Sequence, residues 1–319
     1  MKGRWTAIIA LVLAGCAPSP GPVFSPEVLG AISASIGPLQ VRGVSAAPDV
    51  RTVYVSLCRE DRCSLYEAGE GSSLRLVLND PQWDYRWVAA EGDTLLAVRS
   101  RPGAEYRATE RYDIVRYRPG EASVRVLRSE EQRITSLQSL GGGAFAYFAS
   151  TALAPVPGCN SACRYVPVAQ RLVVVDADGR TVGTMNEVVD GLSGEAYHPW
   201  TEGVWLMMPF DRGRTRQLPA LLTRGPYPEL RVFADMADLS AALPPGGWPP
   251  SLGGFNMIAQ PFRPLDRVVT TETVDLAAPG VAVVAQPALG PDEGVLAIDV
   301  MVRSGDDWSR QSHRTFTLP

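Results

Sequence analysis

The sequence has little of the residue types that most metal and cofactor sites require. Lysine occurs once, at Lys2, and histidine twice, at His198 and His313. Neither histidine stands in the His-x-Glu or multi-histidine spacing of a catalytic metal site. Cys-x-x-Cys pairs and Asp-x-Asp-x-Asp calcium loops are also missing. We therefore expect no metal ion, no cofactor and no redox-active dithiol.

Motifs for nucleophilic catalysis are missing as well. The nearest match to a Gly-x-Ser-x-Gly elbow, residues 191–194, lacks the required spacing. Several acids lie near predicted strand ends and are interpreted as turn or cap residues: Asp84, Asp113, Glu195, Asp211 and Asp266. We therefore predict no catalytic residue.

Basic residues are also fewer than acidic ones. The chain carries 30 basic and 34 acidic residues, a net charge of −4. Nucleic acid binding requires a basic face, so we expect no nucleic acid partner. After residues 6–13 no apolar run approaches the ~20 residues of a membrane-spanning helix.

The N-terminus has the parts of a bacterial export signal. Lys2 and Arg4 precede the apolar residues 6–13, and Leu13-Ala14-Gly15-Cys16 follows. This stretch resembles the lipobox of bacterial lipoproteins. The resemblance implies a diacylglycerol on Cys16, cleavage before it and acylation of the new amino terminus. The alternative is an ordinary signal peptide that happens to contain a cysteine.

The organisation that follows from the lipobox has three parts. Residues 1–15 are the signal peptide, residues 16–39 the lipidated cysteine with a Pro-, Ser- and Gly-rich tether, and residues 40–319 the folded domain. Ala17 after the lipidated position, rather than Asp, fits sorting to the outer membrane. We expect attachment to that membrane by lipid, on its periplasmic face or at the cell surface.

Four further cysteines fall into two close pairs. Cys58 and Cys63 flank four polar residues, and Cys159 and Cys163 flank three residues. An even number of cysteines in an exported chain predicts disulfides. A site of four thiolates is the alternative, but neither pair has the two-residue spacing usual for structural zinc.

The rest of the chain reads as short strands separated by turns, in keeping with 30 glycines and 27 prolines. We expect strands over residues 49–58, 63–68, 73–78, 86–90, 94–101, 112–118, 123–128, 135–140, 144–150, 170–176, 181–185, 197–199, 203–210, 219–223, 229–234, 256–260, 267–275, 281–285, 295–303 and 312–318. Sets of roughly four strands, repeated every ~40 to 60 residues, indicate blades. The predicted fold is all-β, a β-propeller of about five to seven four-stranded blades.

A second resemblance supports this fold. Residues 45–56, with Pro48-Asp49 before an apolar strand, look like the repeat of TolB-type propellers, and residues 200–206 and 289–297 echo it. The motif implies a fold and no function. We expect the final strand, 312–318, to complete the blade opened near residues 38–44, and residues 241–254 to form a surface loop.

Aromatic residues mark a candidate binding surface. Trp83, Tyr85 and Trp87 alternate, so in a regular strand all three share one face, and His198 and Trp200 form a second cluster. Exposed, these residues suit recognition of a sugar or a protein; buried, they pack blades together.

The functional hypothesis is a non-enzymatic propeller, lipid-anchored in the outer membrane, that serves as a scaffold or accessory subunit for other envelope proteins. One alternative is a propeller enzyme or ligand binder that acts on glycans through carboxylates in the central channel. Another is a surface subunit of a filament or secretion apparatus that uses the insertion at residues 151–168.

Overall fold

The computed structural model divides the chain into residues 1–37 and residues 38–319, and the second unit is described here. The structure describes residues 40–47, 49–59, 62–69, 73–102, 110–154, 166–189, 198–201, 203–207, 209–211, 216, 218–243, 273–278, 281–287, 295–304 and 307–317. Cys16, Cys159 and Cys163 lie outside these residues, as does most of the insertion at residues 151–168.

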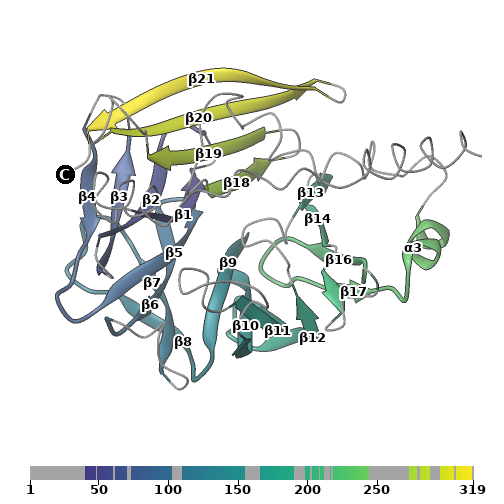
Figure 1. Ribbon diagram of the computed structural model, residues 1–319. Coiled ribbons are helices and arrows are strands. Elements are labelled where there is room, and N and C mark those ends of the chain that lie inside the picture. The colour runs from purple at the N-terminus through teal and green to yellow at the C-terminus, as the bar shows by residue number, and fades with distance from the viewer. Residues whose placement is uncertain are drawn as a thin grey trace, which may run out of the picture. The chain divides into compact units, whose positions relative to one another are not determined.

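Five antiparallel sheets make up this unit (Figure 1). The first sheet contains β1 (Gln40–Ala46), β2 (Val53–Arg59), β3 (Arg62–Ala68) and β4 (Arg75–Leu78). The second contains β5 (Asp84–Glu91), β6 (Thr94–Ser100), β7 (Tyr112–Tyr117) and β8 (Arg125–Glu130). The third contains β9 (Arg133–Gly141), β10 (Ala144–Ala154), β11 (Val166–Val175), β12 (Thr181–Val189) and, beside β12, β15 (Phe210–Asp211).

The fourth sheet contains β13 (His198–Thr201), β14 (Val204–Met207), β16 (Ala220–Thr223) and β17 (Leu230–Val232). The fifth contains β18 (Thr273–Ala278), β19 (Val281–Pro287), β20 (Val295–Ser304) and β21 (Asp307–Thr317). This is a five-bladed β-propeller, as the predicted range of five to seven blades allows. The strands agree with the predicted segments to within a few residues, except that 256–260 and most of 267–275 lie outside the described residues.

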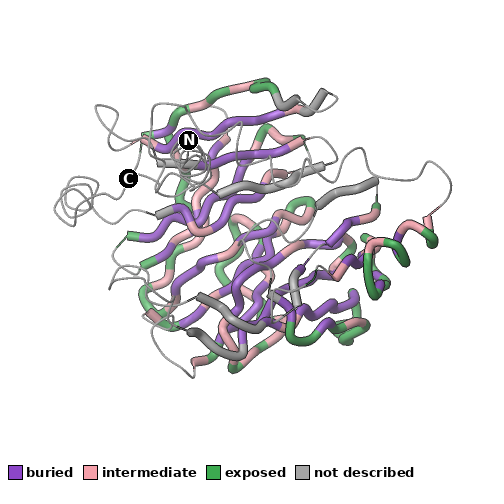
Figure 2. Tube along the Cα trace, turned by 45° about the vertical axis from the view of Figure 1, so that its right-hand side comes forward, coloured by how far each residue is buried: buried purple, intermediate pink, exposed green. Residues whose placement is uncertain are grey.

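The hydrophobic core lies between the sheets rather than inside any one of them. One cluster joins the first and second sheets, another the second and third, and others join the fifth sheet to the first and to the third and fourth. Figure 2 shows the buried residues running along the strands. Apolar residues on both faces of each sheet are therefore required, which explains the near-continuous apolar runs of the inner strands.

The innermost strand of each sheet is its first strand in the sequence, and four of these strands carry a β-bulge at their third residue. Pairing with the next strand shifts by one at Arg42 in β1, Arg86 in β5, Thr135 in β9 and Trp200 in β13. A bulge adds one residue and reverses the side-chain alternation beyond it. Gly43 follows the first bulge, and a Cβ there would lie 3.1 Å from the carbonyl oxygen of Arg86, so any larger residue would push against the backbone of β5.

The connections differ in length between the two ends of the sheets. In every sheet, the second strand connects to the third at the same end at which the innermost strand begins. The strands after which most residues pass before the next strand of a blade begins all end here, so we call it the long-loop end; they are β6, β10, β12, β14 and β17. Loops held by a rigid scaffold are where binding sites concentrate.

The prediction about the chain end is wrong. The final strand, β21, is the outer strand of the fifth sheet, whereas β1 is the innermost strand of the first, so the last strand does not complete the first blade. Helix α3 (Met236–Ala242), which was not predicted, ends within the first residues of the predicted loop 241–254, and residues 244–254 lie outside the described residues. Asp235 caps this helix by accepting hydrogen bonds from the N–H groups of Ala237 and Asp238.

Among the residues that the structure describes, no helix is long and apolar enough to span a membrane.

Candidate binding site

The hairpin of β2 and β3 places Cys58 directly opposite Cys63, and the two form a disulfide with Cα atoms 3.9 Å apart. This pairing is the one predicted from their spacing. Both cysteines are buried, and the next pair of residues toward the tip is Arg59 and Arg62. The disulfide therefore closes the hairpin just below two exposed cations.

A pocket of about 450 Å³ lies beside this hairpin. Among the described residues, its lining comprises Leu57, Arg59, Arg62, Ser64, Tyr66, Asn79 and Pro81. The lining residues of β2 and β3 alternate along their strands and so share one face of the first sheet. Further along, the same face packs against the fifth sheet through Val53 and Val55.

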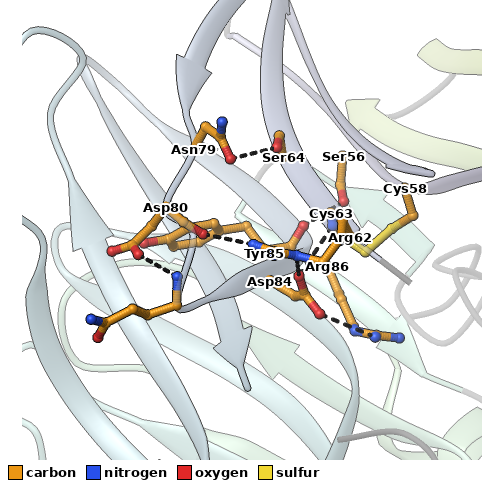
Figure 3. Close-up of polar contacts among 11 residues, drawn as sticks. Ser56, Cys58, Arg62, Cys63, Ser64, Asn79, Asp80, Asp84, Tyr85 and Arg86 are labelled. Atoms are coloured by element: carbon orange, nitrogen blue, oxygen red, sulfur yellow. Dashed lines mark hydrogen bonds and ion pairs between the residues drawn. A yellow bond between two sulfur atoms is a disulfide. The ribbon is translucent and has the colours of Figure 1, made fainter. Parts of the chain in front are cut away.

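The guanidinium of Arg62 is held by two acceptors. Its Nε donates to Oδ1 of Asp84 at 3.0 Å, and its Nη2 donates to the carbonyl oxygen of Asp80 at 3.0 Å (Figure 3). The backbone N–H of Cys63 donates to the same oxygen of Asp84 at 3.3 Å. One carboxylate thus fixes both the disulfide hairpin and the arginine beside it.

Asp84 is the first residue of β5 and is fully buried. Its second oxygen, Oδ2, lies 3.7 Å from Nη2 of Arg86, which is also buried. A buried carboxylate is tolerated only when it is paired, and here two guanidinium groups share it. The hydroxyl of Ser56 donates to the carbonyl oxygen of Tyr85 at 2.6 Å and further ties β2 to β5.

Tyr66 supplies a phenol to the pocket. Burial raises its pKa, and the positive charge of Arg59 offsets only part of this shift. The phenol is therefore protonated at neutral pH and can donate a hydrogen bond. Ser64 and Asn79, joined by a hydrogen bond of 3.1 Å, complete the polar lining.

The predicted aromatic surface does not exist as one face. Tyr85 is buried between the first and second sheets, whereas Trp87 is half-buried against the third sheet. The bulge at Arg86 reverses the alternation between them, and Nε1 of Trp87 donates to the carbonyl oxygen of Ile134 on β9 at 3.2 Å. The prediction that the three rings share one face is therefore wrong.

Trp83 lies just before β5, half-buried, with two guanidinium groups over its ring. The Cζ atoms of Arg99 and Arg101 lie 4.1 and 4.6 Å from the ring centroid. Arg99 also pairs with the buried Asp113, donating from Nε at 3.2 Å and from Nη2 at 3.1 Å. The ring therefore packs within an arginine cluster.

His198 and Trp200 occupy the first and third positions of β13, which correspond to Asp84 and Arg86 of β5. Both pairs therefore stand where an innermost strand begins, at the long-loop end of their sheets. The side chains of His198 and Trp200 lie outside the described residues.

The acids interpreted as turn or cap residues have a different role where the structure describes them. Asp84 and Asp113 are buried in ion pairs with arginines. The side chains of Glu195, Asp211 and Asp266 lie outside the described residues. Among the described residues, no group of three or more His, Cys, Asp or Glu is placed to hold a metal ion.

Sequence reasoning missed the pocket itself. Arg59 and Arg62 were interpreted only as polar residues of a hairpin loop. A signal was present, because a disulfide that closes a short hairpin holds the flanking residues as a cross-strand pair. The contribution of Tyr66, Asn79 and Pro81 depends on how the third and fourth strands pack and has no local signal.

No protein-family model and no curated protein sequence matches this chain. Solved structures match it at low similarity. An oligogalacturonate lyase in complex with manganese is 11% identical, over 84% of this chain and 63% of its own, with a TM-score of 0.39. A xylan beta-1,4-xylosidase from Bacillus halodurans C-125 is 11% identical, over 88% of this chain and 55% of its own, with a TM-score of 0.42. An acylaminoacyl peptidase of Pyrococcus horikoshii is 8% identical, over 86% of this chain and 46% of its own, with a TM-score of 0.38.

This chain therefore spans less than two thirds of the length of each of these enzymes. At such identities and TM-scores the similarity carries no argument about activity. The five-bladed propeller is established by the sheets of this chain itself.

Proposed function

We propose that this protein is a lipoprotein of the bacterial outer membrane whose propeller binds another envelope protein through the arginine pocket. The pocket carries the proposal, because it joins two exposed arginines, a phenol and an amide to apolar surface. Arginine and tyrosine beside apolar surface are the residue types enriched at the centres of protein interfaces. The lipobox at Leu13-Ala14-Gly15-Cys16 supplies the membrane attachment.

Four of the described acids serve to hold the fold together. Asp84, Asp113 and Glu130 each accept from arginine side chains, and Glu91 pairs with Arg116. These carboxylates hold neighbouring strands and sheets together. A catalytic acid needs a free oxygen facing substrate, and none of these four is placed in that way.

Lipidation is tested by metabolic labelling of the full chain with a palmitate analogue. The wild-type protein incorporates the label and fractionates with the outer membrane. Cys16→Ser loses both properties, whereas Arg125→Ala, a change at an exposed residue of β8, keeps both. An unlabelled wild-type protein with an uncleaved Met1 would overturn the anchor.

Docking is tested by a photo-crosslinking amino acid placed at Asn79, an exposed lining residue, in living cells. We expect one discrete crosslinked envelope protein, identified by mass spectrometry. The same probe at Tyr227, which is 67% exposed on the fourth blade, serves as the matched control. Identical crosslinks at both positions would count against the pocket as the contact.

A further inference from the structure

We infer that a buried water molecule bridges Asp84 and Ser100 at the long-loop end of the second sheet. Asp84 is the first residue of β5 and Ser100 the last of β6, and the two stand directly opposite each other. Both side chains are fully buried. The water is independent of the partner proposed for the arginine pocket, but it contacts the carboxylate that holds Arg62.

The first argument is that both side chains carry a polar atom without a hydrogen bond. Oδ1 of Asp84 accepts from Arg62 and from the N–H of Cys63, whereas Oδ2 accepts no hydrogen bond within the described part of the chain. Its ion pair with Nη2 of Arg86 spans 3.7 Å, which is too long for a hydrogen bond. Oγ of Ser100 likewise has no hydrogen-bond partner among the described residues. Buried water typically bonds to such otherwise unsatisfied polar atoms.

The second argument is the spacing of the two side chains. Residues that stand directly opposite each other in an antiparallel pair point to the same face of the sheet, and their side chains start ~5 Å apart. A water molecule that makes two hydrogen bonds joins atoms up to about 6 Å apart. One water therefore fits between Oδ2 of Asp84 and Oγ of Ser100.

A third polar atom lies in the connection to the third sheet. Oε1 of Gln132 is buried and accepts no hydrogen bond from the residues that the structure describes. Gln132 belongs to the two-residue connection from the outer strand β8 to the innermost strand β9. So short a connection has to pass over the ends of β7 and β6, where Tyr112 and Ser100 pair. Gln132 is therefore placed to accept the second hydrogen of the same water.

The charge at the site favours water over a metal cation. The carboxylate of Asp84 already faces two guanidinium groups, those of Arg62 and Arg86 (Figure 3). A metal cation would add a third positive charge beside a single negative one in a buried place. A neutral water donates to Oδ2 of Asp84 and accepts from the hydroxyl of Ser100 without adding charge.

A high-resolution crystal structure of the full lipidated protein in detergent is the direct test. We expect a density peak about 2.6–3.2 Å from both Oδ2 of Asp84 and Oγ of Ser100. Contacts of roughly 2.4 Å, as for a bound cation, would overturn the assignment to water. A map without a peak between the two atoms would overturn the site.

Variants test the part played by Ser100. Ser100→Val removes the hydroxyl and fills the space of the water, so it should abolish the peak and lower the melting temperature by about 4 °C or more. Ser100→Ala should cost less, because the space and Oδ2 of Asp84 remain. Ser123→Val, the same change at an exposed serine of the turn before β8, should leave the melting temperature within about 1 °C of wild type. A peak that persists in Ser100→Val would contradict the bridge, and if that variant does not fold, the wild-type map decides.

Melting temperatures in different salts separate water from a cation in solution. The full protein is compared in sodium, potassium and calcium chloride against choline chloride at equal ionic strength. We expect the difference between wild type and Ser100→Ala to be the same in all four salts. A saturable rise with one metal cation that Ser100→Ala abolishes would identify a cation site and reject the water.

Discussion

Asp113 on β7 shows how single residues join strands in this propeller. Arg99 on β6 and Arg111 donate to its carboxylate, and the hydroxyl of Ser129 on β8 donates at 2.7 Å. Burial alone would raise the pKa of Asp113, but the hydrogen bonds from Ser129, Arg111 and Arg99 outweigh it and lower the pKa below its usual value. The ionised form is therefore the one that stabilises the fold.

The sign of this shift predicts acid sensitivity. The contribution of Asp113 is fully present above its unfolded-state pKa of about 3.9 and is lost as pH falls through the lower folded value. Asp113→Asn should lower the free energy of unfolding at pH 7 by about 3 kcal/mol. Between pH 5 and pH 3, the free energy of unfolding should fall less for this variant than for the wild type. Urea unfolding at each pH measures both quantities. Asp178→Asn, at an exposed turn residue, should match the wild type throughout.

The disulfide gives a second prediction at this scale. Cys58→Ser with Cys63→Ser should cost about 2 kcal/mol of stability, because the ring that it closes is small. Reductant should destabilise the wild type more than the double variant, in which only the predicted disulfide of Cys159 and Cys163 remains. Equal effects of reductant on the two proteins would mean that the disulfide of Cys58 and Cys63 adds no stability.

The roles of residues whose partners lie nearby in the sequence were predictable, whereas the roles of residues whose partners lie on distant segments were not. The pairing of Cys58 with Cys63 follows from their spacing in a hairpin. The role of Asp84 does not, because its partner Arg62 belongs to another sheet and its second partner Arg86 depends on a bulge. A carboxylate at a strand end is interpreted as a turn residue unless those partners are known.

At the scale of elements, the bulges decide which side chains meet. The strands themselves were predictable, because apolar alternation and turns at glycine mark them. The shared face of Trp83, Tyr85 and Trp87 was not, because alternation assumes an unbroken strand. Arg86 is the extra residue of the bulge, and because of it the side chain of Trp87 lies on the face opposite to that of Tyr85. Helix α3 was missed because it is short and precedes a stretch rich in proline and glycine.

Removing the bulge tests this explanation. Deletion of Arg86 should place side chains of one half of β5 on the wrong face and lower the melting temperature by about 10 °C or more. Deletion of Glu121, an exposed residue of the 118–124 turn, should change it by no more than a few degrees. Circular dichroism melts compare the two. Similar melting temperatures would mean that the bulge is dispensable.

At the scale of the whole folded unit, the seam between the first and fifth blades closes the ring without exchange of a strand. Nη1 of Arg314 on β21 donates to the carbonyl oxygen of Arg51 at 2.6 Å, and its Nη2 lies 3.5 Å from that of Val50. A parallel bridge between Ser73 and Thr317 and a shared apolar cluster complete the seam. The last strand does not close the ring as expected, because β21 pairs along its length with β20 of the fifth sheet.

Arg314 should therefore contribute to the stability of the seam. Arg314→Ala should lower the free energy of unfolding by about 2 kcal/mol, since it removes charge-assisted hydrogen bonds to backbone carbonyls. Thr315→Ala, at the exposed neighbouring position, should cost less than about 0.5 kcal/mol. Denaturant unfolding of both variants gives the comparison. Equal stability of the two would assign the seam to its apolar cluster alone.

The lack of strand exchange at this seam has an evolutionary consequence. Apart from the short β15, every sheet is assembled from one uninterrupted stretch of chain. Duplication or loss of the matching stretch of gene would add or remove a whole blade without leaving an orphan strand in another. Joining the natural ends of the ring and opening it between two blades would likewise keep each sheet's strands contiguous in the permuted chain.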